Sequence, residues 1–218
     1  MRFGVLGTGS VGQTIGNKLV ELGHEVTMGA RQAGNEKAVA WATAAGGSAR
    51  AGTMHDAAVF GEIVVNATLG TGSLEALEAA GSENLAGKVL IDISNALDGS
   101  AGFPPAVLSS SKDSLGEQIQ RAFPDARVVK TLNTVNASVM RDPGLIPGGS
   151  SIFLSGNDAA AKETVSELLR SFGWSDGDLI DLGDITTARG TEMYLALWLS
   201  LLRKFGTSHL NIRVVTGA

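Results

Sequence analysis

The chain has 218 residues, of which 17 are Lys or Arg and 22 are Asp or Glu, so its formal net charge is −5 at pH 7. Proteins that bind DNA or RNA usually present a basic surface that replaces phosphate counterions, so this acidic balance argues against a nucleic-acid partner. The sequence contains no Cys, which excludes disulfides, thiol catalysis and thiolate metal sites.

The apolar content predicts a folded core and no membrane partner. Hydrophobic residues make up 44% of the sequence, which is enough for the interior of a chain of this length. A membrane-spanning helix needs roughly 18 to 20 apolar residues, and the most apolar run, residues 193–202, is about half as long. The first residues lack the features of a secretory signal. We therefore expect a cytoplasmic protein.

Residues 1–32 have the pattern of one βαβ unit. Residues 3–6 are a short apolar run that predicts a strand, and the spacing of apolar residues over 11–22 predicts an amphipathic helix. Residues 25–28 predict the next strand. Between the first strand and the helix lies a glycine-rich turn, Gly7-Thr8-Gly9-Ser10-Val11-Gly12.

The alternation of strand and helix patterns continues along the chain. Further helices are predicted at residues 36–45, 54–60, 74–80, 114–122 and 158–172. Further strands are predicted at residues 48–51, 63–67, 89–93, 127–132, 151–155 and 178–182. This order indicates an α/β fold of the Rossmann type, a doubly wound and mainly parallel sheet with helices on both faces.

Two segments depart from this alternation. Residues 95–113 contain Pro104 and Pro105 and are long enough for either an active-site flap or a mobile connection. Residues 185–205 predict one long helix whose middle is apolar on every side. Such a helix needs cover all round, so we expect it to pack on the sheet and against a second subunit, in a homodimer or larger assembly. The alternative is that it lines a ligand pocket.

The turn at residues 7–12 predicts a dinucleotide site. A Gly-x-Gly-x-x-Gly sequence is a weak signal alone, but here it joins a predicted strand to a predicted helix. In that setting the glycines permit the turn, the approach of pyrophosphate and the contact of helix with sheet. The free N–H groups at the start of the helix would bind the diphosphate. The alternative is a purely structural glycine turn.

The end of the second predicted strand distinguishes NAD from NADP. NAD sites place a carboxylate there for the ribose 2′-hydroxyl, whereas NADP sites need a positive group for the 2′-phosphate. This sequence has Ala30 and Arg31 at that point, and its next carboxylate is Glu36. The sequence therefore predicts NADP(H). The alternative is a solvent-exposed Arg at a strand end.

Residue types used in other kinds of catalysis are poorly placed. His24, His55 and His209 lack the spacing of metal ligands. Ser10 has Thr8 where a nucleophile elbow requires Gly. We therefore assign no catalytic side chain and no metal site.

With these residues in view, the sequence resembles the NADP-dependent reductases of the 8-hydroxy-5-deazaflavin coenzyme (factor 420). It is similar also to the cytosolic NADPH-binding domain of the six-transmembrane metalloreductases. The resemblance covers nearly the whole chain and rests on residues 7–12, 23–26, 29–31, 130–135, 181–183 and 188–189. It implies a compact reductase in which NADP and the deazaflavin lie face to face at the carboxyl ends of the strands.

The resemblance also implies roles for individual residues. By position, residues 8–11 would hold the pyrophosphate and Arg31 the 2′-phosphate, residues 66–68 and Asn95 would border the ribose and nicotinamide, and Asn133 would lie where the two rings meet. The expected cofactor-binding residues are Gly7, Thr8, Gly9, Ser10, Val11, Gly12, Ala30, Arg31, Asn66, Ala67, Thr68, Asn95 and Asn133. The chain differs from the common family pattern at two of them, with Ala30 in place of Ser and Asn133 in place of His.

We therefore expect an NADP-binding Rossmann-like domain at residues 1–182 and a C-terminal helical appendage at residues 183–218. The expected activity is that of an NADP(H)-dependent oxidoreductase that transfers hydride between NADPH and a deazaflavin or flavin-like acceptor. Hydride transfer between two heterocycles needs alignment more than a protein acid or base, which agrees with the absence of a catalytic triad. Two alternatives stay open, an NADPH-dependent reductase of another small molecule (a flavin, quinone or imine) and a non-catalytic NADP-binding sensor.

Overall fold

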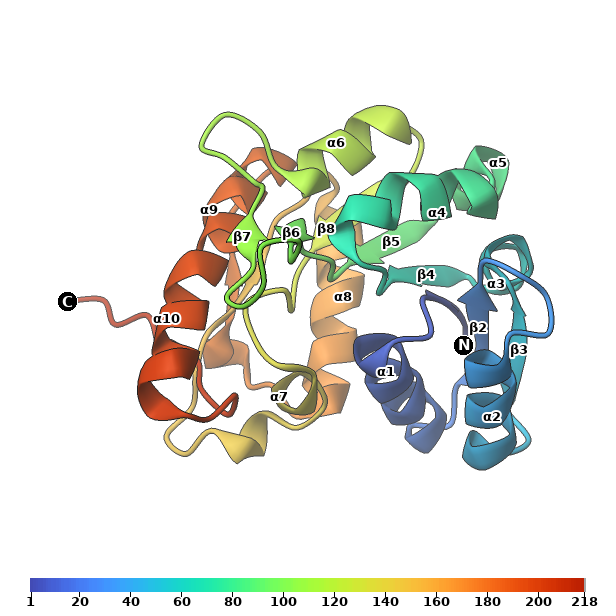
Figure 1. Cartoon of the computed structure of the whole chain (residues 1–218), viewed down its shortest axis with the longest axis horizontal. Coiled ribbons are helices and arrows are strands. Elements are labelled where there is room, and N and C mark those ends of the chain that lie inside the picture. The colour runs from blue at the N-terminus through green and yellow to red at the C-terminus, as the bar shows by residue number, and fades with distance from the viewer. Residues whose placement is uncertain (218) are drawn as a thin grey trace.

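A parallel sheet forms the centre of the molecule (Figure 1). The computed structural model describes residues 1–217, and within them this sheet has six strands in the order β3-β2-β1-β4-β5-β8. The strands are β1 Arg2–Leu6, β2 Glu25–Ala30, β3 Ala49–Thr53, β4 Ile63–Asn66, β5 Val89–Asp92 and β8 Arg127–Lys130. The strand order reverses at β1 and β4, which is the point where doubly wound folds bind their ligands. The α/β, doubly wound fold predicted from the sequence is confirmed.

Helices follow the strands and cover the sheet. They are α1 Ser10–Glu21, α2 Glu36–Ala45, α3 Met54–Phe60, α4 Ser73–Ala80, α5 Ser82–Leu85, α6 Leu115–Ala122, α7 Ala137–Arg141, α8 Ala159–Phe172, α9 Ala188–Met193 and α10 Leu195–Phe205. The predicted helices at residues 36–45 and 54–60 are present with those bounds. The sequence did not predict α5 and α7, because each is too short to show helical periodicity. Each of these helices, within residues 1–217, is too short or too polar to cross a membrane.

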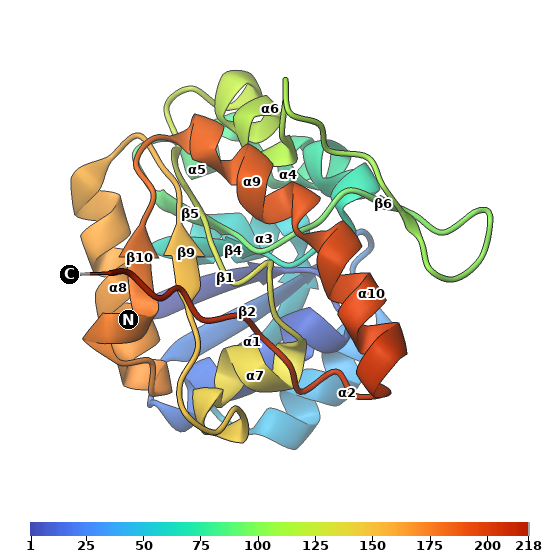
Figure 2. The ribbon, with the colours of Figure 1, turned by 90° about the vertical axis from the view of Figure 1, so that its left-hand side faces the viewer.

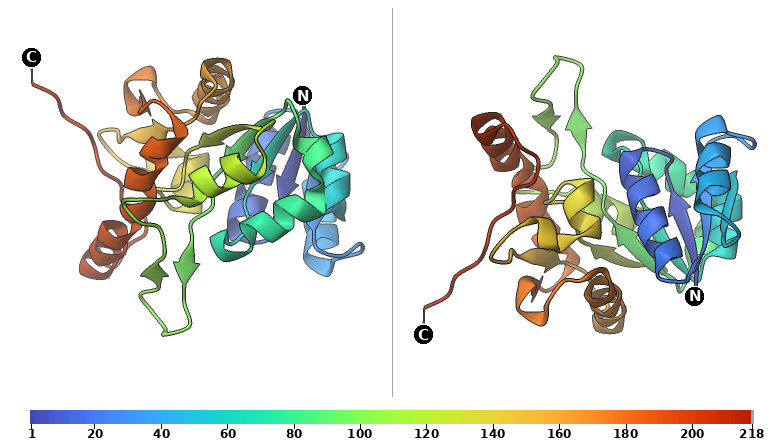
Figure 3. Two further views of the ribbon diagram at one scale, coloured as in Figure 1. Left: turned by 90° about the horizontal axis from the view of Figure 1, so that it is seen from above. Right: turned by 90° about the horizontal axis from the view of Figure 1, so that it is seen from below.

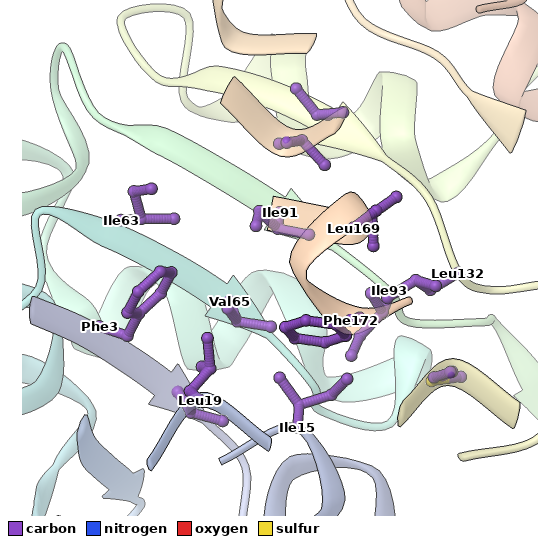
Figure 4. Packing of buried hydrophobic residues seen from close by; sticks show 14 of the residues in the cluster. Phe3, Ile15, Leu19, Ile63, Val65, Ile91, Ile93, Leu132, Leu169 and Phe172 are labelled. Atoms are coloured by element: carbon purple, nitrogen blue, oxygen red, sulfur yellow. The ribbon is translucent and has the colours of Figure 1, made fainter. Parts of the chain in front are cut away.

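Each face of the sheet has its own apolar core. Helices α1, α2, α7 and α8 pack on one face, where Leu19, Leu169 and Phe172 lie against the side chains of the strands (Figure 4). Helices α3, α4, α5 and α6 pack on the other face, around the fully buried Leu77 and Leu90. The strands are therefore covered on both sides, which explains why they read as short continuous apolar runs.

The last two predicted strands form a small sheet of their own. Strands β9 (Ile152–Leu154) and β10 (Leu179–Asp181) pair in parallel with each other, next to α8 (Figure 2). Their contact with the main sheet is a single antiparallel bridge between Lys130 and Ser155. One bridge of opposite direction cannot extend the parallel ladder of β8, so the main sheet ends at that strand.

Residues 95–113 contain a hairpin, although their sequence indicates only a flap or a connection. Strands β6 (Leu97–Asp98) and β7 (Ala106–Val107) pair antiparallel, and Figure 3 shows the hairpin projecting from the body of the molecule. We call residues 95–113 the hairpin segment. Two-residue strands leave no alternating pattern in the sequence, which is why they were not predicted.

The single helix predicted over residues 185–205 is divided in the structure. A 3₁₀ turn, Ile185–Thr187, leads into α9, and α10 follows after a bend at Tyr194 (Figure 2). The bend allows α9 to contact α6 while α10 contacts the hairpin segment. Leu195, Trp198 and Leu199 of α10 are buried against that segment, but Leu197 and Phe205 on the other side of the helix are 53% and 66% exposed.

An ion pair joins the C-terminal helices to α6. The Nε of Arg189 in α9 donates to Glu117 Oε2 at 2.8 Å, and Ser114 donates to the same carboxylate from its N–H at 2.9 Å and its hydroxyl at 2.8 Å. The hydrogen bonds from Arg189 outweigh the effect of burial and hold the pKa of Glu117 below its ordinary value of 4.5. The charged form of Glu117 is therefore favoured in the folded protein. The carboxylate stabilises the fold fully at a pH above its ordinary pKa of 4.5, and this stabilisation is lost as the pH falls through the lower pKa of the folded state.

We expect Glu117→Gln to lower the free energy of unfolding by about 1–3 kcal/mol at neutral pH, because it removes charge-assisted hydrogen bonds from a buried position. The difference from wild type should shrink as the pH falls below 4.5, and urea unfolding at a series of pH values measures it. The control is Glu163→Gln, which removes an exposed ion pair with Arg170 and should have little effect. A difference that stays constant through acid pH would contradict this account.

Candidate functional site

The glycine turn between β1 and α1 combines two structural glycines with one open position. Gly7 has a φ of +115°, and a Cβ added to Gly12 would lie 2.1 Å from the carbonyl oxygen of Gly7, so α1 can pack this close only without a side chain there. A Cβ added to Gly9 would meet nothing within 4 Å. No described side chain caps α1 at Gly9, so the N–H groups of its first turn face outward and can bind an anion.

Two cavities flank this turn and meet at residues 67–69. Cavity A, of about 320 Å³, lies toward β2 and is lined by Gly7, Thr8, Gly9, Ala30, Arg31, Asn35, Met54, Ala67, Thr68 and Leu69. Cavity B, of about 260 Å³, lies toward β5 and β8 and is lined by Ser10, Val11, Ala67, Thr68, Leu69, Ile93, Ser94, Asn95, Leu97, Asn133, Thr134, Val135, Asn136, Ala137, Met140, Leu195 and Trp198. Both open at the carboxyl ends of the strands, where doubly wound folds hold nucleotides.

Cavity A offers an unpaired positive charge. Arg31 is exposed at the end of β2, with one guanidinium nitrogen next to Gly72, and among residues 1–217 it has no carboxylate partner. Asn35 also lines the cavity, with its side chain accepting from Ala38 N–H at 3.2 Å to begin α2. A phosphate bound beside Arg31 would therefore meet a guanidinium that is not already neutralised.

Cavity B has a polar floor and an apolar wall. Asn95 donates from Nδ2 to the carbonyl oxygen of Asn133 at 2.8 Å, and Asn133 donates from Nδ2 to Asn95 Oδ1 at 3.1 Å. Leu97, Leu195 and Trp198 form the opposite wall. Such a cavity suits a flat ring with polar edges.

The backbone is strained beside this floor. Leu132, which precedes Asn133, has a φ of +60°, the single non-glycine residue in residues 1–217 with a positive φ. It is 3% exposed and packs in the core with the α1 and α8 side chains, which hold it in this conformation. Strain of this kind costs of the order of 1–3 kcal/mol and is typical of functional sites.

The open turn and the floor of cavity B fit a dinucleotide. The hydroxyl of Thr134 and the indole N–H of Trp198 have no hydrogen-bond partner within the described part of the chain, but both atoms are buried beneath the surface of the cavity and do not face a ligand. The open position at Gly9 and the amide groups of Asn95 and Asn133, which line the site, fit a dinucleotide extending from cavity A into cavity B.

Asn66 supports the site from below. It is fully buried at the end of β4, donates from Nδ2 to Asp92 Oδ1 at 2.9 Å and to Ser73 Oγ at 3.1 Å, and accepts from the Thr68 hydroxyl at 2.7 Å. The network fixes Thr68, which lines both cavities. Asn66 thus holds a lining residue in place and does not line a cavity itself.

The structure brings most of the predicted site residues together. Cavity A contains Gly7, Thr8, Gly9, Ala30 and Arg31, cavity B contains Ser10, Val11, Asn95 and Asn133, and both contain Ala67 and Thr68. Gly12 and Asn66 are buried beneath them. The prediction missed Asn35, Met54, Leu69, Ile93, Ser94, Leu97, Thr134, Val135, Asn136, Ala137, Met140, Leu195 and Trp198.

A sequence signal existed for only some of the missed residues. Thr134 and Val135 belong to the 130–135 segment that carries the resemblance, and residues 136–137 follow it directly, so these four could have been found. Trp198 comes from the last helix, more than a hundred residues from the glycine turn, and no local pattern links the two. A larger hollow of about 640 Å³ between α1 and α2, next to Trp41, lies away from the strand ends.

Comparison with known proteins assigns the family. Residues 2–96 match the family described as NADP oxidoreductase, coenzyme F420-dependent. A crystal structure from Arthrobacter sp. FB24, described as that of a candidate F420-dependent NADP reductase, is 51% identical, covers 99% of this chain and 100% of its own, and superposes with a TM-score of 0.93. The chain belongs to the F420-dependent NADP oxidoreductase family.

Two curated relatives are more distant. The F420-dependent NADP reductase of Methanocaldococcus jannaschii is 28% identical over 161 residues, which cover 73% of this chain and 70% of that protein. Metalloreductase STEAP3 of Rattus norvegicus is 28% identical over 191 residues, which cover 88% of this chain. The family member thus spans 36% of the length of that metalloreductase.

Two glycine variants should separate folding from binding in this family member. Gly12→Ala forces a Cβ against the carbonyl of Gly7 and should lower the stability by about 1–3 kcal/mol, as overpacking does. Gly9→Ala has free space and a backbone conformation that alanine adopts, so its melting temperature should not change. The new methyl group points to where the diphosphate would approach. The affinity of Gly9→Ala for NADPH should therefore fall by about tenfold or more, which corresponds to a loss of at least about 1.4 kcal/mol of binding free energy.

Thermal unfolding and fluorescence titration with NADPH measure the two effects. Equal losses of stability in both variants would contradict the steric difference between the two glycines, and undiminished NADPH affinity in Gly9→Ala would show that the turn does not bind the diphosphate.

Proposed function

We propose that the protein transfers hydride between NADPH and a deazaflavin or flavin-like acceptor. The observation that carries this proposal is the junction of two cavities at residues 67–69, one with an unpaired guanidinium and the other with the shape and polarity of a ring-binding slot. The adenosine half of NADPH lies in cavity A, the diphosphate at the start of α1, and the nicotinamide in cavity B. The acceptor ring enters cavity B beside Trp198.

Arg31 provides the preference for NADPH over NADH. Its guanidinium binds the 2′-phosphate by charge-assisted hydrogen bonds, which contribute about 1.5–3 kcal/mol, or a preference of about 10- to 150-fold. Ala30 has no side-chain donor, so the preference depends on this one cation. Thr8 and Asn35 line the same cavity and provide neutral polar groups around it.

In cavity B the protein aligns the reactants and excludes water. NADPH supplies the hydride when it is bound. Asn95 and Asn133 hold each other and so keep the polar floor fixed, while Leu97 and Trp198 cover the opposite side. No ionisable side chain of the described residues lines this cavity, so the protein acts by positioning two rings rather than by donating a proton.

The relatives support a deazaflavin as the acceptor. The Arthrobacter structure and the M. jannaschii enzyme are both named for coenzyme F420, and the former matches this chain along its whole length. The metalloreductase relative does not bear on the choice of acceptor, because this chain spans only 36% of it. A flavin or quinone is the alternative acceptor, since Asn133 stands where the family often has His. We further propose that the protein works in the cytoplasm.

The activity is tested by mixing wild type, NADPH and the oxidised deazaflavin and following the absorbance of both. We expect both bands to fall together, in equal molar amounts. Flavin, quinone and imine substrates are assayed in parallel with NADPH. Turnover of one of them without any change in the deazaflavin would replace the proposed acceptor, and no turnover with any of them would favour a non-catalytic NADP-binding protein.

Arg31→Ala should weaken NADPH binding by about 10- to 150-fold and leave NADH binding nearly unchanged. The control is Arg50→Ala, because Arg50 is also an exposed Arg near the sheet edge but is paired with Glu25 at 3.1 Å. Titration of both coenzymes with all three proteins measures the preference. Equal affinity of wild type for NADPH and NADH would refute the role of Arg31.

We also propose a homodimer formed through the outer face of α10. Leu197, Leu201 and Phe205 of α10 follow one another at spacings of four, and Leu197 and Phe205 are more than half exposed although the inner face of the helix is buried. A second copy of the same helix would cover this stripe.

Light scattering at micromolar concentration should give twice the monomer mass for wild type and the monomer mass for Leu197→Glu, because the new charge would be buried between the helices. The control is Val59→Glu, a similarly exposed apolar residue on α3. A wild-type monomer would refute the dimer.

A further inference from the structure

The most deeply buried cation of the described chain lies just behind cavity B. Lys130 ends β8, and its side chain is 0% exposed. Its Nζ lies 2.8 Å from Asp92 Oδ2 and 3.0 Å from Glu192 Oε1, and it donates to the carbonyl oxygen of Ser94 at 2.6 Å. Neither the cofactor site nor the hydride transfer derived above uses this group.

The two carboxylates around Lys130 are held by further donors. Asp92 Oδ1 accepts from Asn66 Nδ2 at 2.9 Å and from the Ser94 hydroxyl at 2.6 Å. Glu192 accepts from the backbone N–H groups of Leu115 at 2.8 Å and Gly116 at 2.9 Å, which begin α6. Burial alone would lower the pKa of Lys130, but the adjacent carboxylates outweigh burial and raise the pKa. The ammonium therefore stays charged and the arrangement is fully hydrogen-bonded.

The ion triad, which consists of Asp92, Lys130 and Glu192, contacts both ends of the hairpin segment. The Ser94 carbonyl belongs to the peptide bond that leads into Asn95, where the segment starts. At the other end, the Ser109 hydroxyl donates to Glu192, and Glu192 also accepts from Leu115 N–H just after the segment. One ammonium group thus connects β8 to both ends of the hairpin.

The hairpin segment contributes one residue to the polar floor of cavity B and one to its apolar wall. Asn95 and Leu97 line the cavity, and Asn95 is paired with Asn133, three residues after Lys130 on the same strand end. If Ser94 or Ser109 moved, the polar floor and the apolar wall would shift together. Buried ion triads often add little net stability compared with apolar residues of similar volume, but their geometry specifies how the elements are arranged.

We propose that Lys130 is a positioning residue for the acceptor: through Asp92, Glu192 and the Ser94 carbonyl, it fixes the hairpin segment as one wall of cavity B. This inference rests on the proposed function for its kinetic consequence, but the positioning itself can be measured without turnover. Lys130 acts through its neighbours and does not line the cavity.

The test compares Lys130→Met with Lys162→Met. Lys162 is the control, because its Nζ also binds a carbonyl, Gly183 at 2.9 Å, and a carboxylate, Asp181 at 2.7 Å, where Lys130 has two carboxylates, but it lies on α8 away from cavity B. Amide hydrogen exchange is measured across the chain. The affinity for the probe 2′-phospho-ADP-ribose, which lacks the nicotinamide ring, measures binding in cavity A and at the start of α1 alone. We expect Lys130→Met to exchange about tenfold faster in residues 95–113, including the Leu108 N–H that donates to Ala96, with the affinity for the probe unchanged.

Kinetics supply the second readout. In Lys130→Met we expect kcat/KM for the acceptor to fall by about tenfold or more while KM for NADPH changes by less than about twofold, because the adenosine and diphosphate contacts in cavity A and at the start of α1 do not involve the hairpin segment. If Lys130 served only general stability, hydrogen exchange would be faster throughout the molecule, and the affinity for the probe would fall as much as kcat/KM for the acceptor. That result, or unchanged exchange in residues 95–113, would overturn the proposal.

Ser109→Ala keeps the test decisive if Lys130→Met does not fold. It removes one hydroxyl from Glu192 and leaves the ion triad intact, so faster exchange is expected only in residues 106–113, together with a smaller loss of kcat/KM for the acceptor. Unchanged exchange there would overturn the proposal. If wild type turns over no acceptor, the proposed function is refuted. Hydrogen exchange in residues 95–113 and the affinity for the probe still test the positioning role of Lys130 in that case.

Discussion

The approach of α1 to β1 is the constraint on which the rest of the site depends. Gly12 lies so close to the carbonyl of Gly7 that any side chain would push the helix away. This contact aims the positive end of α1 at the crevice where the strand order reverses between β1 and β4. The proposed position of the diphosphate, and with it the places of both cavities, follows from that one backbone contact.

Local charge explains how an acidic protein can hold an anionic cofactor. The net charge of −5 is spread over the surface, and exposed arginines such as Arg2, Arg50 and Arg121 are each paired with a carboxylate. Arg31 has no such partner among residues 1–217, and it lines the same cavity as Gly9 at the uncapped start of α1. Because exposed charges are screened within about 10 Å, a phosphate in cavity A responds to these nearby groups more than to the total.

The two cavities differ in how far the family match supports them. All the residues that line cavity A fall within residues 2–96, the part that matches the family model. Cavity B also uses residues 133–140 and the last helix, which lie outside that match. In the function proposed above, nucleotide binding uses the shared part, and the choice of acceptor would depend on the hairpin segment, on α10 and on the buried ion triad that joins them to the strands.

The sequence by itself determined the alternation of the main-sheet strands with the longer helices, the glycine turn and the cation at residue 31, because each of these depends on neighbours in the chain. Apolar periodicity predicted the helices at residues 36–45 and 54–60 with their observed bounds. It could not show that β9 and β10 leave the main sheet, that the last helix bends at Tyr194, or that Trp198 reaches cavity B. Those features, like the meeting of Asp92, Lys130 and Glu192, depend on contacts between distant segments, which only the packing of the whole chain decides.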